Sequence, residues 1–194
     1  MTPVGADRAS GRDLARAIAE EYQALADLLA SSPVEVWDAP SLCEGWRTRK
    51  VVAHVTMPTR YSGPAFMAEL QAAGGDFTRL SNVVADRDGA LPVARLLDDL
   101  RSDVLHSWLP PGGGIEGALT HCVIHELDII EAVPLDRKVP EALVRAVLDL
   151  LSFPDGPTRS ASSSPAYDWR PTTWSGPSAR EMSSPDRVRH SSGC

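Results

Sequence analysis

The hydrophobic positions of the chain follow a helical period. In residues 11–30, apolar side chains recur at three- and four-residue steps with charged ones between them, which predicts an amphipathic helix. Thr48 is predicted as the N-cap of a second helix, and Pro58 as the point where it kinks or breaks. Further apolar stripes predict helices over residues 63–73, 91–105, 115–131 and 140–153. The acidic residues of the 91–105 helix are expected to face solvent: Asp98, Asp99 and Asp103.

The segments between these helices differ in character. Residues 34–46 hold proline and glycine together with Trp37 and Trp46, so we expect a packed loop whose tryptophans most simply fill the core. Residues 76–90 are mixed, with a few apolar anchors. The Gly-rich residues 110–114 lack both the Lys-Ser/Thr that follows a P-loop and the strand that precedes it. They therefore predict a turn leading into the next helix.

The pattern contains no convincing strand, which predicts an all-α protein. Residues 11–153 are expected to form a four-helix bundle with an extra C-terminal helix. Residues 1–10 are predicted to be a disordered leader, and residues 154–194 a disordered tail, because they are rich in Ser, Pro and Arg and nearly lack Leu, Ile and Val.

Composition excludes several functions. The 194 residues carry a net charge of −7 without a basic patch, so nucleic acid is not an expected partner. No apolar run approaches the ~20 residues of a membrane span, and the N-terminus lacks the apolar core of a signal peptide. Cys43, Cys122 and Cys194 form no disulfide framework, which favours a cytoplasmic protein. A monomer or a homodimer is expected.

Two histidines four residues apart give the chain its clearest chemistry. His121 and His125 lie on one face of the predicted 115–131 helix, and His54 lies in another apolar helical segment. Three imidazoles can hold one divalent transition metal and leave a coordination position open. The alternative is that these are polar residues on helices or in the core. Cys122 points about 100° away from His121 around the helix, so it is expected to be a buried free thiol.

Three motifs in order carry a resemblance: Ser41-Leu42-Cys43-Glu44-Gly45-Trp46, Val51-Val52-Ala53-His54-Val55 and His121-x-x-x-His125-x-x-Asp128-Ile129. Together they resemble the mycothiol-dependent maleylpyruvate isomerase family of actinobacteria, within the DinB-like metal-binding helical bundles. The resemblance implies a DinB-like bundle and a divalent metal, usually zinc with nickel or iron as alternatives, on His54, His121 and His125. The sequence departs from the family at His121, where isomerases can have Glu, and at residues 47–50.

The resemblance also implies a reaction. Mycothiol would bind the metal through sulfur and attack a small electrophile, giving cis–trans isomerisation or thiol transfer. The alternative is a metal- or thiol-binding protein without turnover, a sensor or scaffold. Asp128 is expected either to orient His125 or to form a local cap or salt bridge. Arg49 and Arg60 would either hold a carboxylate or lie solvated at the surface.

The tail admits a second interpretation. Members of the resembled family often carry a small C-terminal α/β extension. Back-translation of residues 159–193 with GC-rich codons, read in a shifted frame, yields segments similar to that extension. The codons were chosen among synonyms. We therefore hypothesise that residues 154–194 are a frameshifted product, and an ordinary disordered tail is the alternative.

Overall fold

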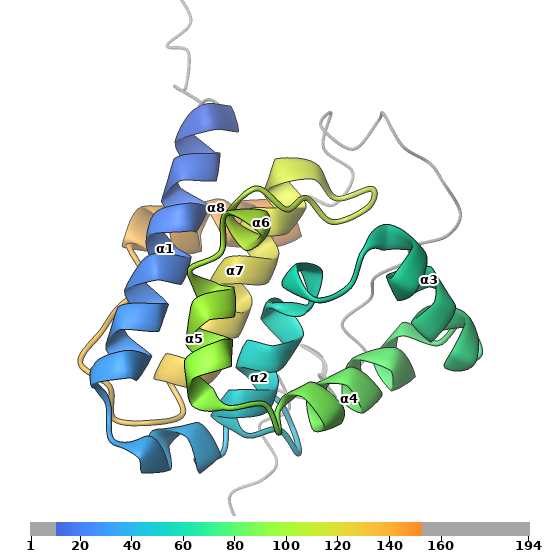
Figure 1. The fold of residues 1–194 in the computed structure, drawn as a ribbon. Helices are drawn as coiled ribbons and strands as arrows, with labels where there is room; N and C mark the ends of the chain where they lie inside the picture. Colours follow the sequence, from blue (N-terminus) through green and yellow to red (C-terminus); the bar gives the residue numbers. More distant parts are fainter. Residues whose placement is uncertain (1–10, 153–194) are drawn as a thin grey trace, which may run out of the picture. The chain divides into compact units, whose positions relative to one another are not determined.

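The structure is a computed structural model that describes residues 11–152, so both the leader 1–10 and the tail 154–194 lie outside the described part. The described residues form helices joined by short loops, with one isolated β-bridge between Pro40 and Arg47. Figure 1 shows the elements, which in chain order are α1 (Gly11–Ser31), η1 (Val34–Asp38), α2 (Thr48–Val55), η2 (Met57–Thr59), α3 (Gly63–Ala72), α4 (Phe77–Asp88), α5 (Val93–Leu100), α6 (Asp103–His106), α7 (Gly114–Ile130) and α8 (Glu141–Ser152).

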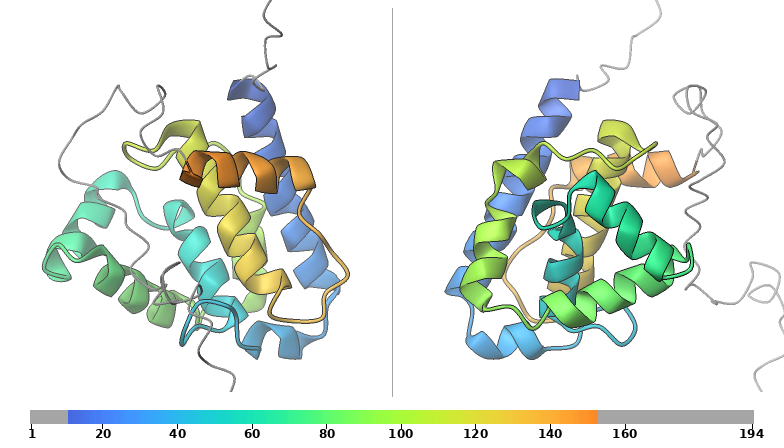
Figure 2. Two further views of the ribbon diagram at one scale, coloured as in Figure 1. Left: turned by 180° about the vertical axis from the view of Figure 1, so that it is seen from behind. Right: turned by 45° about the vertical axis from the view of Figure 1, so that its right-hand side comes forward.

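Helices α1, α2, α5 and α7 pack around the main core, and α8 crosses α7 on its outer side, in front of it in the left view of Figure 2. The apolar stripe of α1 is buried as its period predicts, with Ile18, Leu25 and Leu29 at most 2% exposed. The all-α expectation and the expected bundle are therefore confirmed for the described residues. Within 11–152, none of the helices combines the length and the apolar character that crossing a bilayer requires.

Helices α3 and α4 form an arm beside the bundle (Figure 1). Helix α2 stops at Val55, and Pro58 lies in the short 3-10 helix that follows, so the break predicted at this proline is confirmed. Helix α3 buries no residue fully. The arm has its own small core, in which Met57, Leu80 and Val84 are buried and Phe66 and Phe77 pack against them. This arrangement brings the start of α4 close to the end of α2.

Three local predictions were wrong. Residues 76–90 were expected to be mixed, yet Phe77–Asp88 form α4, which Asp76 caps by accepting a hydrogen bond from the Arg79 N–H at 3.0 Å. The single helix over 91–105 is two, because α5 ends at Leu100 and Ser102 caps the separate α6. Thr48 is the first residue of α2 rather than its N-cap, which is Arg47.

A buried ionic cluster corrects the expectations for Arg60 and Asp99. Arg60 is only 9% exposed and lies between two carboxylates, with its Nε 2.9 Å from Asp88 and its Nη1 2.7 Å from Asp99. It also donates to Thr56 Oγ1 at 2.8 Å and to the Ala53 carbonyl. Arg60 is thus neither solvated nor free for a ligand, and Asp99 does not face solvent. The positive charge of Arg60 and the negative charge of Asp99 compensate each other in the interior. The cluster joins the end of α2 to α4 and α5.

Candidate metal site

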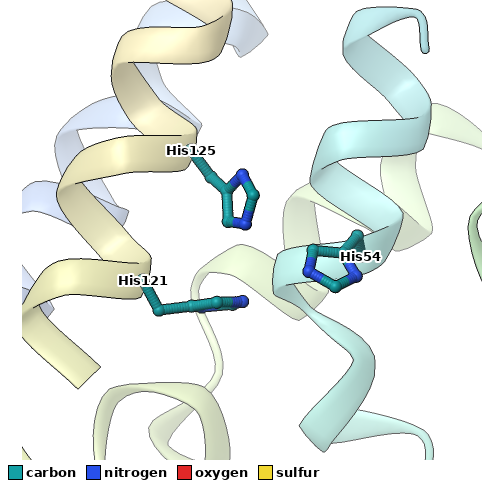
Figure 3. Close-up of side chains that lie close together, drawn as sticks. All are labelled: His54, His121 and His125. Carbon is teal, nitrogen blue, oxygen red and sulfur yellow. The ribbon is translucent and has the colours of Figure 1, made fainter. Parts of the chain in front are cut away.

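Two helices bring the three predicted histidines together. His54 lies in the last turn of α2, and His121 and His125 lie one turn apart on the face of α7 that packs against α2. The ring centroids are 5.3 Å apart for His54 and His121, 5.0 Å for His54 and His125, and 4.8 Å for His121 and His125. Figure 3 shows a nitrogen of each ring directed toward the other two rings. The sequence prediction that these residues share one site agrees with this geometry.

The donor set fits a divalent transition metal. One ligand nitrogen from each ring lies within 4.8 Å of the others. Metal–nitrogen bonds of about 2.0–2.1 Å at tetrahedral angles place two ligand nitrogens about 3.3 Å apart, so small ring rotations suffice to bind an ion. Three protein ligands leave a fourth position for water or substrate. Metal binding by these residues stays a prediction.

Burial keeps the imidazoles of His54 and His121 neutral in the metal-free protein. The pKa of His54 is lowered to about 3, first by burial and then by the nearby His125. The pKa of His121 is also lowered, chiefly by burial and further by the other two histidines. A neutral ring retains the lone pair that a metal needs, so the low pKa values prepare the site for a cation.

Asp128 is in hydrogen-bonding contact with His125. Its Oδ2 lies 2.9 Å from His125 Nδ1, one turn along α7. In the neutral tautomer with its proton on Nδ1, His125 donates a hydrogen bond to the carboxylate, and its Nε2 lone pair is left for a metal. Either expected role of Asp128, orientation of the ring or a local salt bridge, would use this contact, so its role stays a prediction. Only His125 has such a partner: the buried Nδ1 atoms of His54 and His121 accept or donate no hydrogen bond within residues 11–152.

Three aromatic residues surround the histidines. Trp46, from the loop before α2, meets His54 edge-on at 5.2 Å between ring centroids, and Phe77, at the start of α4, lies 6.3 Å from the same ring. Trp108, from the loop before α7, meets His121 at 5.4 Å. Trp46 was expected to fill the core and Trp108 had no predicted role, because loop residues follow no periodic pattern that would place them at a site.

Cys43 is the site residue that sequence reasoning missed. Its thiol lies 3.0 Å from Asp128 Oδ2, the oxygen that also contacts His125. Cys43, His125 and Asp128 form a second group whose ligand atoms all lie within 4.8 Å of one another. Burial and the adjacent carboxylate raise the pKa of the Cys43 thiol above its ordinary value, which keeps it protonated. Cys122, by contrast, is a buried free thiol as expected.

The two arginines expected to bind a carboxylate have different surroundings. Arg60 is committed to Asp88 and Asp99. Arg49 lies near Asp38, with 3.7 Å between Nε and Oδ1. The buried Nε of Arg49 has no hydrogen-bond partner among residues 11–152, so its expected role toward a carboxylate stays a prediction.

The fold and the site together define a helical bundle with a three-histidine candidate metal centre. Residues 18–110 match the family model described as the mycothiol maleylpyruvate isomerase N-terminal domain, which places this part of the chain in that family and confirms the resemblance seen in the motifs. The matched segment includes His54 and Cys43 and ends before α7, where His121 and His125 lie. The all-α fold is accordingly a DinB-like bundle. No curated protein and no solved structure matches the chain significantly.

Proposed function

We propose that the protein is a metal-dependent enzyme that uses a low-molecular-weight thiol, mycothiol, for cis–trans isomerisation of, or thiol transfer to, a small electrophile. The observation that carries the proposal is the convergence of His54, His121 and His125, with ring centroids 4.8–5.3 Å apart. The family to which residues 18–110 belong is the reason for proposing mycothiol as the thiol. A divalent metal, most simply zinc, would supply the charge that turns a thiol into a thiolate nucleophile.

The residues of the chain have defined roles in this proposal. The three imidazoles bind the ion, and Asp128 fixes the ring of His125 through the contact at 2.9 Å. Trp46, Phe77 and Trp108 contact the histidine rings and exclude water beside them. A dry site strengthens the attraction between a cation and a thiolate.

Metal analysis tests the proposal. Protein purified without a His tag is expected to hold one metal per chain, and His121→Ala to lose it. His106→Ala is the matched control, because His106 stacks on Tyr22 at 6.2 Å between centroids and lies in no metal-ligand group. Equal metal content in wild type and His121→Ala would refute the three-histidine site.

Two further measurements separate an enzyme from a binder. Calorimetric titration with mycothiol is expected to show binding to the metal-loaded protein alone. Maleylpyruvate and a set of conjugated electrophiles then test turnover. Thiol binding without conversion of any of them would support the alternative, a non-catalytic metal- or thiol-binding protein.

A further inference from the structure

Asp128 is held by three hydrogen bonds from two parts of the chain. Its carboxylate Oδ2 contacts His125 Nδ1 at 2.9 Å and Cys43 Sγ at 3.0 Å. Its backbone carbonyl accepts the Leu42 N–H at 2.9 Å. Two of the three bonds come from Leu42 and Cys43 in the loop before α2. Cys43 is 85 residues from Asp128 in the sequence. The loop is thereby fastened to the same helical turn that carries a proposed ligand.

The direction of these bonds follows from donor chemistry. A carboxylate oxygen only accepts, so both the Cys43 thiol and the Nδ1 of His125 must donate to it. The bond to Nδ1 fixes one tautomer of the ring and leaves Nε2 without a proton. The bond from Cys43 holds the carboxylate itself, because Asp128 has side-chain freedom that a single partner does not remove.

The loop has its own internal support, which is separable from this contact. Ser41 donates to the Trp46 carbonyl at 3.0 Å, and the Ser41 N–H bonds to the same oxygen at 3.0 Å. Gly45, at φ +75°, makes the turn between them. These loop bonds do not involve the Cys43 thiol, which contacts Asp128.

We propose that Cys43 is a positioning residue of the metal site: its S–H holds the Asp128 carboxylate in the orientation that aligns His125. This inference rests on the proposed metal function. Residues that orient a ligating histidine typically contribute 10–100-fold in metal affinity. Cys43 lies one hydrogen bond further from the ion than Asp128 does, so we expect Cys43→Ala to lower the metal affinity about 10-fold.

Metal titrations of three variants test the inference. Zinc affinity is measured against a chromophoric chelator. Cys43→Ala is expected to bind about 10-fold more weakly, and Cys43→Ser, which keeps a donor, within about threefold of wild type. Leu42→Ala is the matched control for the loop, since it shortens a neighbouring loop side chain that is 60% exposed and keeps the backbone bond to Asp128. An equal loss in Leu42→Ala and Cys43→Ala would assign the effect to the loop as a whole and overturn the proposal.

A double-mutant cycle identifies the route of the effect. If Cys43 acts through Asp128, adding Cys43→Ala to Asp128→Ala should cause no further loss of affinity. Additive losses would show that the thiol acts on the ion directly. Loss of a second equivalent of metal in Cys43→Ala would likewise overturn the proposal, because Cys43, His125 and Asp128 would then be a separate metal site.

Imidazole ¹H–¹⁵N spectra of chelator-treated protein provide a readout without metal. Wild type is expected to show His125 protonated at Nδ1 alone, and Cys43→Ala to show a mixture of tautomers, restored to one by Cys43→Ser. Identical spectra for wild type and Cys43→Ala would refute the positioning role. A wild type that binds no metal would refute the proposed function, and these spectra would still decide the role of Cys43.

Discussion

Replacement of Arg60 by Met is expected to destabilise the protein by about 3 kcal/mol. The side chains of Arg60, Asp88 and Asp99 are 9%, 9% and 6% exposed, so the substitution leaves two carboxylates buried without their shared cation. Removing one partner of a buried ion pair costs about 3–5 kcal/mol.

The remaining contacts place Arg60→Met at the lower end of that range. Asp88 keeps the Tyr61 hydroxyl at 2.9 Å and Arg87 at 3.3 Å, and Asp99 keeps Arg95 at 2.9 Å. Arg87 and Arg95 are about half exposed, at 48% and 52%, so solvent screens both pairs and they only partly compensate.

Urea unfolding of the chelator-treated protein measures the effect. With a urea m-value of about 2 kcal/mol/M, a 3 kcal/mol loss lowers the midpoint by about 1.5 M. Arg101→Met is the control, because Arg101 pairs with Asp27 at 2.9 Å on the surface and should cost less than about 1 kcal/mol. A loss below about 1 kcal/mol in Arg60→Met, together with a raised KM for an anionic substrate, would refute the structural role and restore Arg60 as a ligand-binding residue.

Three more outcomes are expected. Gly45→Ala should lower the free energy of unfolding by about 1–2 kcal/mol, because Gly45 has φ +75°. A Cβ added there would meet no atom within 4 Å, so the cost is backbone strain alone. An unchanged urea midpoint would contradict this. Trp46→Phe removes the indole bond to Asn82 Oδ1 at 2.7 Å and should lose about 1 kcal/mol, with no further loss when Asn82→Ala is added; additive losses would show that the two side chains act separately. Burial lowers the pKa of His54 to about 3, so as the pH falls this ring takes up a proton in the unfolded chain before it does so in the folded protein. The chelator-treated protein should therefore lose stability from about pH 6.5 towards pH 3. His54→Phe should show a shallower loss, and parallel stability curves for the two proteins would exclude this contribution.

Local patterns in the sequence settled much of the architecture. Apolar spacing located α1, α3, α7 and α8 to within one or two residues, because an amphipathic helix must bury one face wherever it packs. The same spacing is present in α4, but no helix was predicted there. Its Phe77, Leu80 and Val84 recur at helical steps, yet the segment is short and its apolar face belongs to the small core of the arm rather than to the bundle.

The sequence by itself determined that His121 and His125 share a helix face, since four residues advance an α-helix by about one turn. The motifs predicted that His54 joins them, but helical spacing could not fix its position across from them, the contacts of Trp108 and Phe77 with the rings, or the burial of Asp99 against Arg60. Those contacts join residues distant along the chain, and only the packing of α2, α4, α5 and α7 decides them. The bond from Cys43 to Asp128 is the clearest case: it crosses 85 residues, and no periodicity encodes a contact at that separation.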